Sequence, residues 1–193
     1  MNLTLAFRRW VPLAVGFTLV GVLVCTMGQQ HFRQSANDPQ VQIAEDAAAV
    51  LERGGAVQSV VPVGTVDIAH SLAPFVEITD NTGKPIVSSG RLDGQMPQVP
   101  VGVFAFARLK GEHRVTWQPR PYVRSALVIV RYEGKNPGFV VAGRSLREME
   151  SRVVMMTVRI AIAWVVIIIA TFLAVLVPER KKGESRLLGE ETP

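Results

Sequence analysis

The sequence predicts an α+β domain held between two membrane-spanning helices. Two windows carry the helices: Val11–Met27 and Ile160–Val177 contain 17 and 18 residues and no charged side chain. As helices they would measure about 26 and 27 Å, close to the roughly 30 Å hydrocarbon core of a bilayer. Between the windows, short runs of strand-forming residues alternate with turn residues, and the later runs follow one another directly. That order is typical of an antiparallel sheet.

A cleaved signal peptide is the competing interpretation of the first window, because Arg8 and Arg9 provide a basic start. Its 17 apolar residues exceed the usual signal core of about 7–15 residues, and no Ala-x-Ala site follows. A lipoprotein site at Cys25 would require a small residue before it, whereas Val24 stands there. We therefore expect a membrane helix.

Charged residues beside the two windows predict the orientation. Arg8 and Arg9 precede the first window, and four basic residues follow the second: Arg180, Lys181, Lys182 and Arg186. Basic flanks stay cytoplasmic, so we expect a two-pass protein of a bacterial inner (plasma) membrane with a periplasmic or extracellular centre. The expected segments are a cytoplasmic start (1–10), a first span (11–27), an outer domain (28–159), a second span (160–177) and a cytoplasmic tail (178–193).

The same basic flanks suit anionic lipid headgroups, so membrane lipid is the first expected partner. The segment between the spans has 15 basic and 12 acidic residues, and they are scattered. This surplus is too small to predict nucleic-acid binding.

The outer segment opens with helix signals. In "NDPQVQIAEDAAAVLERGG", Asp38 suits a cap, Pro39 suits the first helical position, and Gly54 and Gly55 suit the end. A second, short helix is predicted over Val66–Leu72, ending before Pro74.

Five strands are predicted next. Phe75–Thr79 and Ile86–Ser89 flank the turn-forming run Asp80–Gly83. After the loop "RLDGQMPQVPVG", a short helix is predicted over Val103–Leu109. Three further strands follow, "HRVTWQ", "VRSALVIVRY" and "GFVVAGR". We expect one antiparallel sheet with helices on one face.

The exit from the domain is a long helix. Ser145 and Glu148 have the spacing of a capping box, and no Pro or Gly follows Leu146 until Pro178. Before the membrane, an apolar stripe repeats at spacings of three and four residues: Leu146, Met149, Val153 and Met156. Two interpretations are open, a homodimer seam or packing of the stripe on its own domain.

The combination of two spans, "PFVEITDNTGKPIVSSG", "GFVVAGRSLREME" and a helix running into the membrane resembles bacterial membrane sensor histidine kinases. The resemblance covers about residues 10 to 180 and implies a PAS-like (Cache-type) extracytoplasmic sensor domain. In such kinases the second span leads into dimerisation and ATP-binding modules. Here "PERKKGESRLLGEETP" follows, so we expect no kinase activity in this chain and a separate membrane kinase as one candidate partner.

Catalytic chemistry is not predicted. His31, His70 and His113 lie far apart without neighbours at metal-ligand spacing, so we expect no metal, no cofactor and no enzyme. Cys25 is the single cysteine, which excludes an intrachain disulfide.

The strand arginines give one candidate ligand pocket. Arg124 or Arg144 could bind an anionic small molecule, because a guanidinium pairs with a carboxylate through two hydrogen bonds. Trp117 lies nearby in the sequence. A solvated sheet edge for the arginines and a core position for Trp117 are the alternatives.

Two classes of function follow. The first is a signal-input or regulatory protein that passes an outside cue through its second membrane helix. The second is a structural or assembly protein whose outer domain docks on another membrane protein, which an exposed apolar patch would favour. A membrane enzyme has no supporting set of residues.

Overall fold

The computed structural model describes residues 3–35 and 38–188. They form two compact units, one made of residues 3–31 with 152–188 and the other of residues 32–35 with 38–151. The expected segments 1–10, 28–159 and 178–193 include residues 1–2, 36–37 and 189–193, which lie outside the described residues. Each unit is described by itself below.

The first unit is a pair of long helices. Helix α1 spans Leu3–Ser35 and helix α4 spans Arg147–Leu188, continuing past Pro178. Both contain stretches long and apolar enough to cross a membrane, Ala6–His31 and Arg147–Leu176, and no residue of the 18-residue apolar window within each stretch is buried. Apolar side chains left uncovered on so many faces are typical of helices surrounded by lipid.

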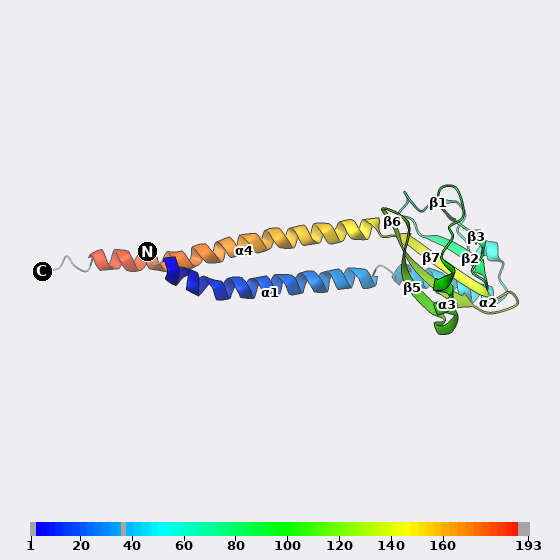
Figure 1. Ribbon diagram of the computed structural model, residues 1–193, viewed down its shortest axis with the longest axis horizontal. Helices are drawn as coiled ribbons and strands as arrows, with labels where there is room; N and C mark the ends of the chain where they lie inside the picture. Colours follow the sequence, from blue (N-terminus) through cyan, green and yellow to red (C-terminus); the bar gives the residue numbers. More distant parts are fainter. Residues whose placement is uncertain (1–2, 36–37, 189–193) are drawn as a thin grey trace. The chain divides into compact units, whose positions relative to one another are not determined.

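The two helices run antiparallel along each other (Figure 1). Near the start of α1, the Trp10 indole N–H donates to Thr171 Oγ1 at 3.1 Å, and its ring meets Phe172 edge-on at 5.4 Å. Farther along α1, Trp164 donates to Thr18 Oγ1 at 3.0 Å. Polar side chains thus bond between the helices, where hydrocarbon offers no alternative partner.

The face of α1 that meets α4 is made mostly of small residues. A Cβ added to Gly21 would lie 3.7 Å from Trp164 Cδ1, and one added to Gly28 would lie 2.9 Å from Met156 Sδ. The half-buried or buried positions of this face repeat every three or four residues: Ala6, Trp10, Ala14, Thr18, Gly21, Cys25 and Gly28. Small residues allow close helix approach, a common basis of packing between membrane helices.

The second unit is built on a five-stranded antiparallel sheet of order β3-β2-β7-β6-β5. Its strands are β2 (Phe75–Asp80), β3 (Pro85–Ser88), β5 (Glu112–Arg120), β6 (Val123–Tyr132) and β7 (Gly138–Ser145). All five predicted strands are present, and the α+β class with one antiparallel sheet is confirmed. The first and last strands pair, with Phe75 opposite Gly143 and Asp80 opposite Gly138.

Helices cover both faces of this sheet (Figure 1). Helix α2 (Asp38–Glu52) packs its Ala44, Ala48 and Leu51 against Val76, Ile78, Val128, Val140 and Ala142. On the other face, Phe104 and Ala107 of α3 (Val101–Lys110) pack with Phe75, Leu127, Ile129, Phe139 and Val141. The prediction of helices on one face was wrong, because the central strands β2, β6 and β7 are buried on both sides.

The prediction of a helix over Val66–Leu72 was also wrong. Val66–Asp67 is a short strand, β1, which pairs in parallel with β4 (Gly90–Arg91). The amides of Val66 and Ile68 donate to the carbonyls of Ser89 and Arg91 at 2.7 and 2.9 Å. Because these two amides are bonded to β4, they cannot form the hydrogen bonds of a helix. Pairing with β4 therefore decides the conformation here, although the local sequence favours a helix.

The hairpin turn between β2 and β3 formed as predicted. Asp80 Oδ1 accepts bonds from the amides of Thr82 and Lys84 at 2.8 and 3.0 Å, and the Thr82 hydroxyl also donates to it. These bonds lower the pKa of Asp80, and the bond from the Thr82 hydroxyl has the largest effect. Gly83 has φ = 88°, a conformation that glycine adopts without strain.

The remaining helices match the sequence closely. The first predicted outer helix is α2, and the short helix expected at Val103–Leu109 is α3, which begins two residues earlier. A short 3-10 turn, η1 (Val57–Ser59), follows α2. The side chain of Asp38, the expected cap of α2, lies outside the described side chains.

Candidate functional site

The residues of the expected ligand pocket lie on opposite faces of the sheet. Trp117 is 8% exposed and belongs to the core under α3. Arg124 and Arg144 alternate with Val123 and Gly143, so they project toward the face that α2 covers. The three residues therefore do not line one pocket, and Trp117 has the core position that was its alternative.

Both arginines have partners within the domain. Arg124 Nη1 bonds Glu150 Oε1, and Arg144 Nη2 bonds Glu148 Oε2 at 3.1 Å. Arg144 Nε also donates to the Leu72 carbonyl at 3.1 Å. Their guanidinium groups are thus directed at the first turn of α4 and at the chain after β1, rather than gathered around a vacant anion site.

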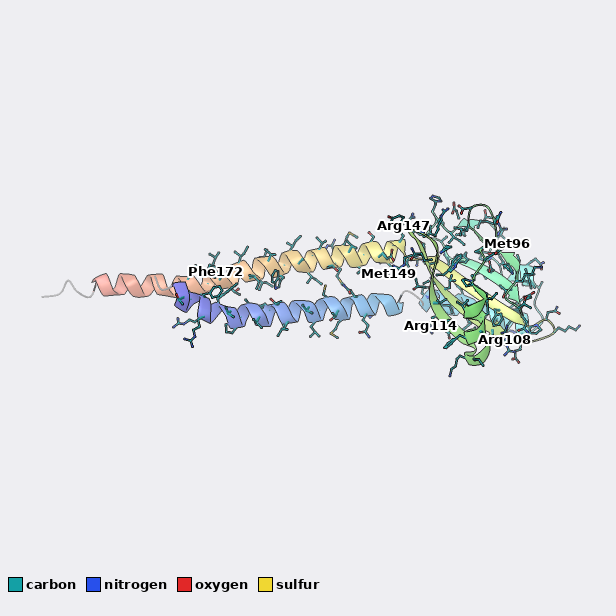
Figure 2. All side chains as sticks on the ribbon, viewed as in Figure 1. Met96, Arg108, Arg114, Arg147, Met149 and Phe172 are labelled. Atoms are coloured by element: carbon teal, nitrogen blue, oxygen red, sulfur yellow. The ribbon has the colours of Figure 1, made fainter. Side chains whose placement is uncertain are left out.

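A third arginine completes this cluster. Arg147, at the start of α4 (Figure 2), donates from Nη2 to the carbonyl of His70 at 2.7 Å. The Leu146 amide donates to the Arg124 carbonyl at 2.9 Å. We call this cluster the α4 junction; it consists of Arg124, Arg144, Arg147, Glu148 and Glu150 together with the turn 67–72.

The turn 67–72 is itself well ordered by local bonds. Asp67 Oδ1 accepts from the Ala69 amide at 2.9 Å, and Asp67 Oδ2 lies 2.9 Å from His70 Nδ1. The His70 bond is the main reason that the pKa of Asp67 is lowered. The Asp67 carbonyl also accepts from the amides of His70 and Ser71. Both carbonyls that the junction arginines contact are therefore held in a fixed turn.

The predicted cap residues lie where β7 becomes α4. Ser145 is the last residue of β7, and Leu146 alone separates it from α4. Ser145 Oγ accepts a bond from the Arg147 amide at 3.3 Å. Glu148, the other expected cap residue, has its carboxylate against Arg144. The strand and the helix consequently share bonded residues at their boundary.

The predicted dimer stripe has mixed surroundings. Leu146 and Met149 are half-buried within the second unit, and Figure 2 marks Met149 near the start of α4. Val153 and Met156 belong to the helix pair, where the Met156 thioether lies against Gly28 of the same chain. Part of the stripe thus has an intrachain contact, and the homodimer stays a prediction.

An unexpected group lies on the other face of the sheet. Glu77, in the middle of β2, is fully buried. Its register partners are Ser88 on β3 and Val141 on β7, and it shares the α3 face with Phe75. Among the described residues, neither Oε1 nor Oε2 has a hydrogen-bond partner. A buried ionised carboxylate without partners is strongly disfavoured, so the neutral acid is the favoured form.

Burial raises the pKa of Glu77 to about 8. The Ser88 hydroxyl and the Arg91 guanidinium lower it only in part. The Ser88 hydroxyl bonds Gly90 and not the Glu77 carboxyl: it donates to the Gly90 carbonyl at 3.3 Å and accepts from the Gly90 amide at 3.1 Å. Burial without hydrogen-bond partners thus favours the protonated form of the Glu77 carboxyl group.

The neighbouring corner between β3 and β4 is made of polar groups bonded to one another. Arg91 Nη1 donates to the carbonyls of Ser88 and Gly90 at 2.6 and 2.8 Å. Ser89 is buried and bonds Val76 through both its hydroxyl and its amide. The corner thus joins the strand that carries Glu77 to β4, which in turn pairs with β1.

The histidines occupy ordinary positions. His70 pairs with Asp67, and His113 Nδ1 lies 3.1 Å from the Val103 carbonyl. Within residues 3–35 and 38–188, no group of three or more His, Cys, Asp or Glu residues has the arrangement of a metal site.

Sequence reasoning missed both Glu77 and the function of the arginines at the junction. A signal for Glu77 existed: a lone acid between Val76 and Ile78, inside a run of strand-forming residues. The junction had no local signal, since His70 and Arg147 are 77 residues apart.

Comparison of the chain with protein-family models, curated proteins and solved structures found no match.

Proposed function

We propose that this chain is a two-span membrane protein whose outer domain is a PAS-like sensor and whose helix α4 carries the signal to a partner. Both ends would be cytoplasmic and the sheet domain periplasmic or extracellular. The basic residues that flank the spans support this orientation. The antiparallel sheet supports a PAS-like domain. In the chain, α3 follows the β2–β3 hairpin and precedes the last three strands, β5, β6 and β7.

One observation carries the proposal: the α4 junction joins the start of α4 to three separate parts of the domain. Arg124 holds it to β6, Arg144 to β7, and Arg147 to the turn after β1. A change in how these parts pack must move the start of α4 or break charged hydrogen bonds. A bistable packing of this kind is a known basis of signalling.

A chimera tests the proposal. Residues 1–182 would replace the input region of a membrane histidine kinase whose cytoplasmic modules have a measurable output. We expect the double variant Arg144→Ala, Arg147→Ala to change the basal output at least severalfold, while Lys135→Ala, on an exposed loop, leaves it unchanged. Equal output from all three proteins would overturn the signalling proposal.

Topology needs a separate measurement. Reporter fusions at Pro193 and near Gly94 should report the cytoplasm and the outside, respectively. A Pro193 fusion active only outside would refute the orientation.

The assembly class is supported by a different observation. Helix α3 exposes an apolar face, with Val101 73%, Phe106 47% and Leu109 84% exposed. Such a face favours docking on another protein. A photo-crosslinking residue at Phe106 or Leu109 should then give one discrete adduct in membranes, with the exposed loop residue Val63 as the control position.

A further inference from the structure

We propose that Glu77 is a proton-binding site and that its protonation state is communicated to the start of α4. The ligand is thus the proton itself. The inference deepens the proposed function, and only its last step, from α4 across the membrane, rests on it.

Among residues 3–35 and 38–188, the surroundings of the Glu77 carboxyl contain no charged group that would stabilise its ionised form by a direct bond. Glu77 lies between Ser88 and Val141, on the face covered by α3. The facing residues of β2 and β7 are Phe75, Thr79, Phe139 and Val141, none of which is charged. From α3, Arg108 is directed away, because it bonds the Asn81 carbonyl and lies over the Phe139 ring. From the loop before α3, Asp93 is paired with Arg120.

Arg91, on β4, is the cation that acts on this carboxyl. Its Nη1 is bonded to the carbonyls of Ser88 and Gly90, while Glu77 has no partner. When the carboxyl gives its proton to solvent, a negative charge appears in an apolar site beside this guanidinium. Because charge-assisted bonds are stronger than bonds to carbonyls, we expect Arg91 to turn from Ser88 and Gly90 to the carboxylate.

That movement would reach α4 through two hydrogen bonds to β1, the short backbone segment that follows β1, and one hydrogen bond to Arg147. The Arg91 carbonyl accepts from the Ile68 amide at 2.9 Å, and the Ser89 carbonyl accepts from the Val66 amide at 2.7 Å. The chain then forms the turn 67–72, whose His70 carbonyl accepts from Arg147. The two-residue pairing of β1 with β4 is the weakest part of the sheet to disturb, since it has few bonds.

The test uses the full chain in lipid nanodiscs, with the proton as the only ligand. Infrared spectroscopy follows the carboxylic acid band between pH 6.5 and 9. Hydrogen exchange, corrected for the intrinsic effect of pH with an unstructured peptide, follows residues 66–72 and 144–150. Wild type should lose a buried acid band near pH 8, the pKa of Glu77, and exchange in both segments should become about tenfold faster.

Three variants make the result decisive. Glu77→Gln preserves size and neutrality, so it should fold and should lack both the titrating band and the pH effect on exchange. Glu45→Gln, at an exposed position of α2, should behave as wild type. Arg91→Gln should keep the titrating band and lose the exchange effect.

The outcomes that overturn the proposal are equally definite. A pH effect on exchange that persists in Glu77→Gln assigns the site to another group. A titrating band without any change in residues 144–150 refutes the communication to α4. The chimera described above uses neither Glu77 nor pH, so its failure would be a failure of the signalling function alone.

Discussion

Arg147 and His70 are joined by a hydrogen bond of 2.7 Å from the guanidinium Nη2 to the backbone carbonyl, across 77 residues of sequence. The bond connects the first residue of α4 to the turn after β1. Both ends lie within the same compact unit, residues 32–151. The start of α4 is therefore positioned by tertiary contacts as well as by its continuity with β7.

The first prediction concerns this bond. Arg147→Ala should leave the domain folded but speed hydrogen exchange of residues 68–72 about fivefold, since an exposed charged hydrogen bond is worth about 1 kcal/mol. Arg53→Ala provides the control, because Arg53 bonds a carbonyl of its own helix region, that of Ala49. Unchanged exchange in Arg147→Ala would show that the turn holds without it.

The second prediction concerns pH and stability. Folding raises the pKa of Glu77 from an ordinary 4.5 to about 8. Between these values the folded state keeps a proton that the unfolded state releases, so stability must fall as pH rises through this window. Below about pH 4.5 both states are protonated and the effect vanishes; above about pH 8 the loss is complete, at most about 5 kcal/mol.

Pulse proteolysis in urea would measure this loss. Glu77→Gln should match wild type near pH 5 and be more stable than wild type at pH 8.5. If the stabilities of the two proteins changed with pH in the same way, the assignment of the titration to Glu77 would be contradicted.

The third prediction uses two glycines of α1. A side chain at Gly28 would collide with Met156, whereas nothing lies within 4 Å of a Cβ at Gly16. Gly28→Leu should therefore weaken the helix pair and Gly16→Leu should not. Crosslinking of Thr18→Cys to Trp164→Cys by a short thiol-reactive bifunctional reagent, in a Cys25→Ser background, reports the pairing, because the wild-type side chains are in contact. Equal yields in the two leucine variants would count against the packing.

The fourth prediction contrasts two glycines of the outer domain. A Cβ at Gly143 would collide with the Phe75 ring and lie 2.6 Å from Leu127 Cδ2. Gly143→Ala should destabilise the domain by about 1–3 kcal/mol or more, as overpacking does. Gly102, on α3, has open space around it, so Gly102→Ala should stabilise by up to about 1 kcal/mol. Urea midpoints of the two variants should move in opposite directions.

Much of the outer domain could be predicted from local sequence. "FVEITD", "VRSALVIVRY" and "GFVVAGR" became β2, β6 and β7, because β-branched and aromatic runs bounded by turn residues leave few alternatives. Local pattern could not predict the strand order, because each residue of β2 pairs with a residue of β7 that is 58 to 68 positions away, from Asp80↔Gly138 to Phe75↔Gly143. It also failed at Val66–Asp67, where pairing with β4 decided the conformation.

The candidate site was harder to predict for the same reason. Arg124 and Arg144 were proposed from the sequence as residues of a ligand pocket, whereas their partners in the structure are Glu150 and Glu148 of α4. Glu77 was passed over because a single acid in a strand is ordinary when one face is solvated. It becomes exceptional only once both faces of β2 are known to be covered.

The fifth prediction concerns the homodimer. Single cysteines at Leu146 and Met149, in a Cys25→Ser background, should form inter-subunit disulfides if the stripe is a seam. Met149→Glu should weaken assembly by several kcal/mol, because it buries unpaired charge. Ser151→Glu, at an exposed position of α4, is the control; Glu150 is unsuitable because it pairs with Arg124. Absence of crosslinks along 146–151 would favour a monomer.

The pairing of β2 with β7 has a consequence for biosynthesis. β2 has β3 on one side and β7 on the other, so one edge of β2 cannot pair until residues 138–145 have been synthesised. The residues that follow β7 along the chain form α4, which begins at Arg147. The second edge of β2 is therefore paired only when synthesis has reached the start of α4, and a pause in synthesis before residue 138 would leave the β2–β3 hairpin with one unpaired edge.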